Sequence, residues 1–276
     1  MRKIGSIVVA GCLLGVAAST FAAPEDDLKS LQKFYKERFP DLKQDEYVNG
    51  VYALDAGLRE QWQAIEDFPP YEMDIDEGKK LFETPFKNGK TYGSCFEKGG
   101  ISIAHKYPYF DAKTGKVVTL EQAVNDCRKT NGEEPLPWYK GKIAQIMSYM
   151  NFTSRGNVIK VDIPNDAARQ AYEQGRKYYF ARRGQLNMSC AHCHIDNAGR
   201  RIRADLLSPA IGHAAHWPVY RSDWGAVGTL QMRFDGCNKQ VRAKAAAPQS
   251  DEYRNLEYFI TYMSNGLPLA GPTSRK

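Results

Sequence analysis

Apolar residues recur at helical spacing over several stretches of the chain, and they predict a mainly helical protein. Over residues 25–38 the apolar positions lie three or four apart, with acidic residues first and basic residues last, which is typical of a surface helix. A second helix is predicted over 46–68, where Pro69 and Pro70 end an apolar stripe. That stripe consists of Val51, Leu54, Leu58, Trp62 and Ile65.

Three more helices are predicted later in the chain from apolar spacing and from capping residues at their ends. Their ranges are 143–152, Asn165 or Asp166 to about Arg183, and Ser250 to about Gly266. Residues 158–163 have the composition of a strand. Residues 206–236 are rich in glycine, proline and aromatic side chains, and we expect them to form loops.

The amino terminus has the pattern of a secretory signal. Arg2 and Lys3 precede an apolar run from residue 4 to 18, and small residues follow at 20–22. We therefore expect residues 1–22 to be removed and the mature protein to be periplasmic. The sequence Val-Ala-Gly-Cys ending at Cys12 also resembles a lipoprotein box, which is the alternative processing site. No later run is long enough for a membrane span.

The small net charge and the even spread of basic residues exclude nucleic acid as a partner. The formal net charge is +6 for 276 residues, and it falls to +4 when Arg2 and Lys3 leave with the signal. The remaining basic residues are spread along the chain instead of forming a cluster. A mildly basic protein is compatible with a small anionic substrate.

The most specific motif is Cys190-Ala191-His192-Cys193-His194, a C-x-x-C-H sequence typical of a c-type haem. Two cysteines three positions apart can form thioethers to the two vinyl groups of the porphyrin, while the adjacent histidine reaches the iron. A zinc half-site or a redox C-x-x-C is the alternative, but no second C-x-x-C follows. We therefore predict Cys190 and Cys193 as the covalent haem attachments and His194 as an iron ligand.

The chain also contains a weak internal repeat. Gly78 lies seventeen residues before Cys95, and Gly175 lies fifteen before Cys190, each in a short segment that continues with basic and aromatic residues. Each half then ends in an apolar helix, which is the layout of small cytochromes c. We predict an all-α fold with two cytochrome-c-like domains, at 23–155 and 156–276.

The first predicted domain lacks the haem motif, because Cys95 is followed by Phe-Glu-Lys-Gly without a second cysteine or a histidine. One covalent haem c is therefore expected in the whole chain. In an oxidising compartment Cys127 is the natural disulfide partner of Cys95. The bridge would close a loop of about thirty residues and stabilise the fold by roughly 3–4 kcal/mol. Pairing of Cys237 with either of them is the alternative.

The second axial ligand of the iron must come from the residues after His194. The candidates are Met232, Met263, His213, His216 and Cys237. Met263 fits a core position in the last helix, and two histidines alone would make a weak zinc site. Cys237 is favoured because it is the remaining thiol, Gly236 allows a ring to approach, and Arg233 favours a thiolate. An ordinary buried cysteine and a surface arginine are the plainer interpretation.

With these residues the chain resembles the SoxA family, the L-cysteine S-thiosulfotransferase subunit of the SoxAX cytochrome complex. The likeness is densest from Cys190 onward, in Leu207–Gly212, Trp217–Arg221, Gly228–Leu230, Arg233-Phe234, Cys237-Asn238, Arg242-Ala243 and Leu256–Ile260. The resemblance implies that His194 is the proximal ligand, that Cys237 is the distal ligand and active-site sulfur, often a persulfide, and that Arg233 is catalytic. Two-haem members have a second attachment motif, so this chain is similar to the single-haem type, with a Cys95–Cys127 disulfide in its place.

The resemblance also implies an activity: coupling of thiosulfate to a cysteine of a SoxYZ-like carrier protein, with release of two electrons. Because one haem passes one electron at a time, a SoxX-like cytochrome c is expected as the partner in a heterodimer. The alternative is a non-catalytic electron-transfer cytochrome c in which Met232 or Met263 ligates iron. A third interpretation is a haem-based sensor with an open site.

Overall fold

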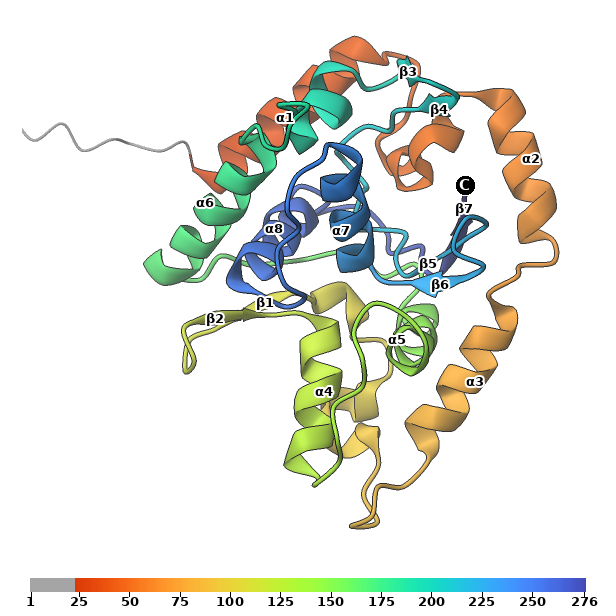
Figure 1. Ribbon diagram of the computed structural model, residues 1–276, viewed down its shortest axis with the longest axis vertical. Helices are drawn as coiled ribbons and strands as arrows, with labels where there is room; N and C mark the ends of the chain where they lie inside the picture. Colours follow the sequence, from red (N-terminus) through yellow and green to blue (C-terminus); the bar gives the residue numbers. More distant parts are fainter. Residues whose placement is uncertain (1–22) are drawn as a thin grey trace, which may run out of the picture.

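The computed structural model describes residues 23–276 (Figure 1). The signal peptide and the lipoprotein alternative at Cys12 therefore lie outside the described residues. The α-helices are α1 (Pro24–Arg38), α2 (Ala56–Glu66), α3 (Glu72–Glu83), α4 (Leu120–Thr130), α5 (Lys142–Phe152), α6 (Asp166–Phe180), α7 (Leu230–Gln240) and α8 (Asp251–Tyr262). The strands are β1 (Tyr109–Asp111), β2 (Lys116–Val118), β3 (Arg201–Ile202), β4 (Asp205–Leu206), β5 (Val219–Arg221), β6 (Ala226–Gly228) and β7 (Thr273–Arg275).

Short helical turns complete the fold. The 3₁₀ turns are η1 (Gln44–Ala53), η2 (Tyr92–Cys95), η3 (Glu97–Gly100) and η4 (Ala104–Lys106), and η5 (His192–Asp196) is π-helical. Within the described range, no helix is both long and apolar enough to cross a membrane.

The two halves repeat one structural unit, and its hairpin and the helix after it recur with an offset of 110 residues. In the first half the hairpin β1–β2 pairs Tyr109 with Val118 and leads into α4. In the second half β5–β6 pairs Val219 with Gly228 and leads into α7. The weak repeat in the sequence is therefore a repeat in the structure, and within the hairpin and the following helix, residues 110 positions apart can be compared directly.

Each unit is closed by two helices that cross at a glycine. Helix α3 crosses α5 at Gly78, and α6 crosses α8 at Gly175. A Cβ at Gly78 would fall under 3.0 Å from the backbone of Gln145, and one at Gly175 would fall equally close to the backbone of Asn255. Only glycine fits where two helix backbones approach this closely, which explains why both repeat segments contain one.

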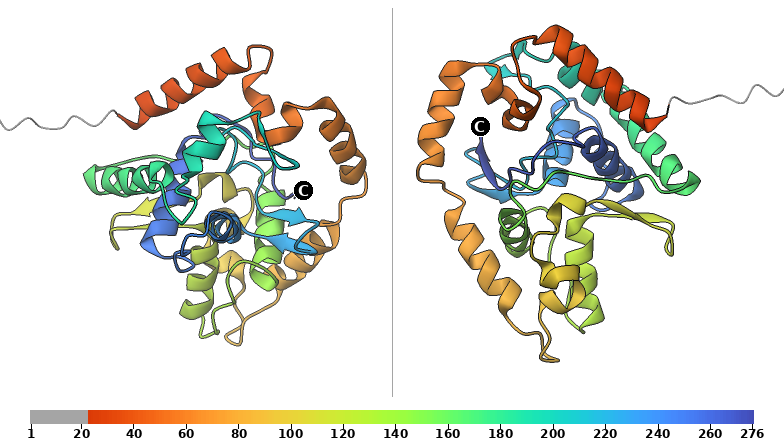
Figure 2. Two further views of the ribbon diagram at one scale, coloured as in Figure 1. Left: turned by 45° about the horizontal axis from the view of Figure 1, so that its top comes forward. Right: turned by 180° about the vertical axis from the view of Figure 1, so that it is seen from behind.

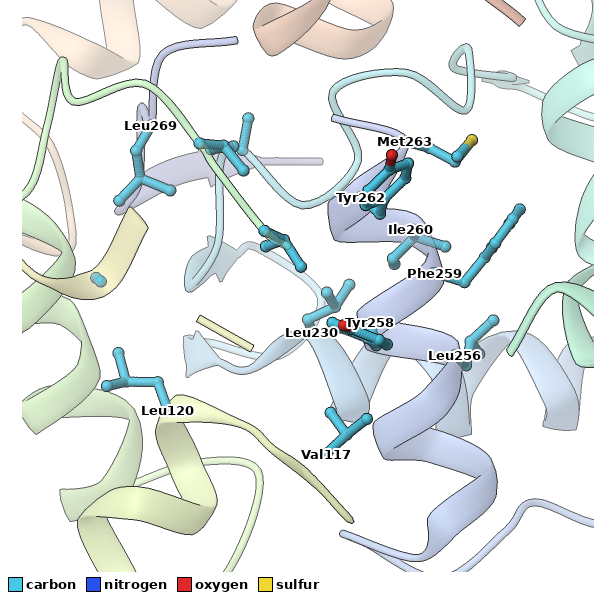
Figure 3. Packing of buried hydrophobic residues seen from close by; sticks show 14 of the residues in the cluster. Val117, Leu120, Leu230, Leu256, Tyr258, Phe259, Ile260, Tyr262, Met263 and Leu269 are labelled. Carbon is cyan, nitrogen blue, oxygen red and sulfur yellow. The ribbon is translucent and has the colours of Figure 1, made fainter. Parts of the chain in front are cut away.

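One hydrophobic core joins the two halves (Figure 3). Helix α8 contributes Leu256, Phe259 and Ile260, and the first residues of α4 and α7, Leu120 and Leu230, belong to the same cluster. Burial of such side chains stabilises the fold by about 1.5–3 kcal/mol each.

Helix α1 lies beside α6, as Figures 1 and 2 both show. Asp27 of α1 accepts a hydrogen bond from the Tyr172 hydroxyl at 3.0 Å and forms an ion pair with Arg176 at 2.8 Å. Helix α1 thus contacts the second half of the chain. The domain boundary near residue 155 is not tested by this contact and stays a prediction.

The expected helical fold class is confirmed as a mainly helical fold, but residues 23–276 also contain three small sheets, β1–β2, β3–β4 and β6–β5–β7, which the all-α prediction did not include. Their strands have only two or three residues, too few for an alternating pattern to be visible in the sequence. The segment 158–163 is not a strand, and Val158 makes only an isolated bridge to Pro268.

Two further expectations need correction. The helix predicted over 46–68 is divided into η1 and α2, since Asp55 caps α2 by accepting the Leu58 amide at 2.9 Å. The loop predicted over 206–236 contains β5, β6 and the start of α7. Gly236 within α7 hides this helix in the sequence, because glycine is a poor helix former.

Candidate functional site

The haem-attachment motif follows α6 after a short loop that the Arg183–Met188 bridge closes, and its second half forms η5. The Ser189 hydroxyl accepts the His192 amide at 3.1 Å and fixes the start of the turn. Cys190 and Cys193 are free, half-buried thiols. Burial raises the pKa of Cys190 to about 11, against a smaller opposing effect of Arg183, so its neutral thiol form is favoured. Both sulfurs are therefore available for covalent attachment.

His194 is held in the orientation of a metal ligand. Its Nδ1 donates to the backbone carbonyl of Ser208 at 2.9 Å, and this leaves Nε2 unprotonated. Burial lowers the pKa of the ring to about 4, so the imidazole is neutral near pH 7. A neutral imidazole with a fixed tautomer fits an axial position on haem iron.

Two residues of α1 anchor this turn, and sequence reasoning missed both. The Tyr35 hydroxyl donates to the backbone carbonyl of His194 and accepts the Ala210 amide at 2.8 Å. The Arg38 guanidinium donates to the carbonyls of Ile195 and Asp196 at 3.3 and 3.1 Å. In the sequence Tyr35 was visible only as part of the apolar stripe of α1, which gave no sign of its partner in the second half.

The two histidine candidates for the second iron ligand, His213 and His216, lie away from the side of the site opposite His194. The His213 ring makes an edge contact with the His194 ring, with centroids 4.3 Å apart, and its Nε2 lies 3.0 Å from the Ser208 hydroxyl that is also near His194. His213 is therefore on the same side as His194. His216 is buried and stacked on Trp217. No group of three His, Cys, Asp or Glu side chains suited to a metal ion occurs in residues 23–276.

The two methionine candidates pack against protein. Met263 is 3% exposed and belongs to the core, as Figure 3 shows. The Met232 sulfur lies at the hairpin, 2.8 Å from where a Cβ on Gly228 would be. Both positions suit packing better than ligation.

Cys237 lies on α7, and not in a loop as the sequence suggested. Its thiol is free, and its charge contributes to raising the pKa of both Cys190 and Cys193, after the larger effect of burial. Asn238, the next residue, anchors α7 by donating to the Phe234 carbonyl and the Tyr253 hydroxyl at 2.8 and 3.1 Å. The fold thus places Cys237 within electrostatic range of Cys190 and Cys193.

Arg233 precedes Cys237 by one turn of α7. Its guanidinium has no hydrogen bond or ion pair with any residue of the described chain. It is close enough to add to the lowering of the His194 pKa, for which burial is the main cause. A partner-free guanidinium beside this turn is suited to bind an anion.

Cys95 and Cys127 are joined by a disulfide with their Cα atoms 5.7 Å apart. Cys127 is the counterpart of Cys237 in the repeat, since the two lie 110 residues apart on α4 and α7. The bridge borders a pocket of about 480 Å³ in the first half. Cys127, which is disulfide-bonded in the first half, thus corresponds to Cys237, which is a free thiol in the second half.

The residues of the second half fit a covalent haem c. Two free thiols stand three positions apart, His194 has an unprotonated ring nitrogen, and a third thiol lies near them. A Cβ added to Gly236 would meet no described atom within 4 Å, so α7 has open space beside Cys237. Haem c in this place would be held by Cys190, Cys193 and His194.

Comparison with known proteins agrees with this arrangement. The family described as SoxA/TsdA, cytochrome c domain, matches residues 77–159 and 174–269, which are the two repeat units. The L-cysteine S-thiosulfotransferase subunit SoxA of Allochromatium vinosum is 52% identical over 99% of this chain and 98% of that protein. The SoxA subunit of Chlorobaculum tepidum is 52% identical over 92% of this chain and 89% of that protein.

A solved structure has the same fold. The crystal structure of SoxXA from P. pantotrophus superposes with a TM-score of 0.72 at 32% identity, covering 79% of this chain and 84% of the matched chain. From the haem-attachment turn, the repeat and these likenesses together, the chain belongs to the SoxA family of L-cysteine S-thiosulfotransferase subunits.

Proposed function

We propose that the protein is the catalytic subunit of a periplasmic thiosulfotransferase, which couples thiosulfate to a cysteine of a SoxYZ-like carrier. The placement of free Cys237 beside the haem-attachment turn, one helical turn after Arg233, is the observation that supports this most directly. The names of its relatives support the same activity. The likeness to SoxXA supports a SoxX-like cytochrome c as the partner in a heterodimer.

The site residues have distinct roles in this proposal. Arg233 binds the sulfonate oxygens of thiosulfate and directs its outer sulfur toward Cys237. The Cys237 thiolate forms a sulfur–sulfur bond from its Sγ to that outer sulfur, giving Cys237-Sγ–S–SO₃⁻ and two electrons, which pass to the cytochromes. The carrier thiolate then attacks the same sulfur atom, receives S–SO₃⁻ and regenerates the Cys237 thiolate. The carrier thiol loses one proton in the overall reaction.

In the proposal, Cys190 and Cys193 would hold one covalent haem c, and His194 and Cys237 would ligate its iron. Such a group would supply one-electron transfer, so the proposal includes a partner cytochrome to take the second electron. The first half, residues 23–155, would carry no haem, and it has the Cys95–Cys127 disulfide. Cys237 as a persulfide would follow the same chemistry with one more sulfur atom.

The alternative function is a non-catalytic electron carrier with methionine as the second ligand. The core position of Met263 and the packing of Met232 against the β5–β6 hairpin disfavour it. Far-red absorption separates the two, because a methionine–iron band is expected only for the carrier.

The proposed activity is tested with the protein and its cytochrome partner mixed with thiosulfate and a SoxYZ-like carrier. Mass spectrometry of the carrier is expected to show one added S–SO₃ group, and absorption of the cytochromes is expected to show two electrons for each adduct. Reduction of the cytochromes without any adduct on the carrier would contradict the proposal. The same mass measurement on this protein reports the number of haems and any sulfur added to Cys237.

A further inference from the structure

A second arginine lies beside the candidate site, at the end of β5. Arg221 is largely covered, with its side chain 17% exposed. Its Nε donates to the Asp223 carboxylate at 3.0 Å, and its guanidinium lies over the Trp224 ring, 5.3 Å from the centroid. Its terminal nitrogens make no hydrogen bond to any residue between 23 and 276. Arg221 is thus held at its Nε edge and has two NH₂ groups available.

The β5–β6 hairpin places this arginine next to the start of α7. The Trp224 ring packs on Gly228, where an added Cβ would lie 2.6 Å from the ring and 2.8 Å from the Met232 sulfur. Arg233 is the next residue of that helix. Burial is the main cause that lowers the pKa of Arg221, and the charge of Arg233 lowers it further, while Cys237 acts in the opposite direction. The two guanidinium groups and Cys237 therefore lie in one neighbourhood.

Two like charges in one neighbourhood without a shared carboxylate repel each other, and a bound anion relieves that repulsion. Asp223 contacts the Nε of Arg221, and no ion pair joins Arg233 to any residue of the described chain. The two guanidinium groups thus carry more positive charge than the Asp223 carboxylate balances, and this excess favours binding of a small anion.

The first half provides an internal comparison. Counting back 110 residues, Arg221 corresponds to Asp111 and Arg233 to Ala123, while Cys237 corresponds to Cys127. All three first-half residues line the pocket of about 480 Å³ at the disulfide. The two copies share the hairpin, the helix and the cysteine, but only the half with the free thiol has the two arginines.

Building on the function proposed above, we propose that Arg221 is a second substrate-binding residue, which with Arg233 forms a two-guanidinium site for the thiosulfate dianion beside Cys237. Arg221 binds sulfonate oxygens through its terminal nitrogens, while Asp223 and Trp224 fix its orientation. The second positive charge matches the second negative charge of the ligand, so the site favours sulfur oxyanions with two charges over those with one.

The test compares Arg221→Gln and Arg221→Lys with the unchanged haem-loaded heterodimer, using thiosulfate and the carrier. For Arg221→Gln the KM for thiosulfate is expected to rise ~10–100-fold, as for loss of a hydrogen bond to a charged group, with a smaller change in kcat. The inhibition constant of sulfate, an unreactive dianion, is expected to rise in parallel. Arg221→Lys keeps the charge without the planar fork and should give intermediate values.

Arg169→Gln is the matched control, since Arg169 is an exposed arginine paired with Asp166 on α6. Its KM should not change. An unchanged KM and sulfate constant in Arg221→Gln would overturn the proposal. A shifted haem potential with unchanged KM would also overturn it, because Arg221 would then serve a haem propionate. If the unchanged protein forms no carrier adduct, the proposed function itself fails, which is a separate outcome.

Discussion

Cys127 and Cys237 occupy the same position in the two repeat units, each on the helix that follows a β-hairpin and a threonine N-cap. The Cys127 sulfur is bonded to Cys95, whereas the Cys237 sulfur is free beside Cys190 and Cys193. The same scaffold position thus stabilises one half and provides a reactive thiol in the other.

Replacing Cys237 by serine is expected to abolish thiosulfate coupling and leave the covalent haem in place. Cys190, Cys193 and His194 lie in a separate turn, so attachment does not depend on α7. Electron paramagnetic resonance should lose the low-spin thiolate signal that we expect for the unchanged protein. Full coupling activity in Cys237→Ser would remove Cys237 from the mechanism.

Replacing Arg233 by alanine is expected to weaken thiosulfate use without changing haem content. The guanidinium has no partner among residues 23–276, so its loss breaks no contact within the fold. A KM increase of ~10–100-fold corresponds to one lost hydrogen bond to a charged group. Steady-state kinetics measure it, and Arg169→Gln again serves as the control; equal kinetics for Arg233→Ala and the unchanged protein would be contrary to our model.

Removing the first-half disulfide is expected to lower stability and spare the haem. The bridge joins positions 32 residues apart. The double variant Cys95→Ser/Cys127→Ser should lose about 3–4 kcal/mol of unfolding free energy. Denaturant unfolding measures the loss, and the absorption spectrum of the haem checks that the second half is unchanged. An altered haem spectrum would mean that the two halves depend on each other more closely than we infer.

Replacing Gly175 by alanine is expected to disrupt the crossing of α6 and α8. The added Cβ would clash with the carbonyl of Asn255, so the helices must separate. A loss of roughly 1–3 kcal/mol is expected, in the range for overpacking. Gly57→Ala is the matched control, because Gly57 lies in α2 and its Cβ would meet only the Asp55 carboxylate at 3.5 Å. Thermal unfolding should rank Gly175→Ala well below Gly57→Ala.

A pair of buried carboxyl groups predicts how stability depends on pH. Glu121 and Glu257 line a cavity of about 50 Å³ between the halves, and Gln231 donates to Glu257 at 2.9 Å. Burial, and secondly the charge of Glu121, raises the pKa of Glu257 to about 8, and burial raises that of Glu121 to about 7. Both groups are therefore protonated in the folded protein at mildly acidic pH.

The direction in which the unfolding free energy changes with pH follows from proton binding to Glu257. Between the ordinary pKa of 4.5 and the raised value of about 8, the folded chain holds a proton on Glu257 that the unfolded chain has released. The stabilising contribution is complete below pH 4.5 and is lost as pH rises through about 8. Glu257→Gln should flatten this decline in unfolding free energy, whereas exposed Glu60→Gln should leave it unchanged. An equally steep decline in Glu257→Gln would show that Glu257 is not the responsible group.

The sequence by itself determined the features that are local along the chain. The C-x-x-C-H motif places two thiols and an imidazole within five residues, so its chemistry is readable without a fold. The amphipathic helices and the likeness to the SoxA family were also visible, as was the pairing of Cys95 with Cys127 among its alternatives.

Which residues lie opposite and around that motif is known only from the tertiary structure. Cys237 is 43 residues after His194, and packing of α7 on the second half brings it near Cys190. Packing of other elements puts His213 beside the His194 ring and brings Tyr35 of α1 to the haem turn, while the β5–β6 hairpin places Arg221 near Arg233. These relationships cannot be predicted from residue types and spacing, because each depends on how separate elements pack against one another.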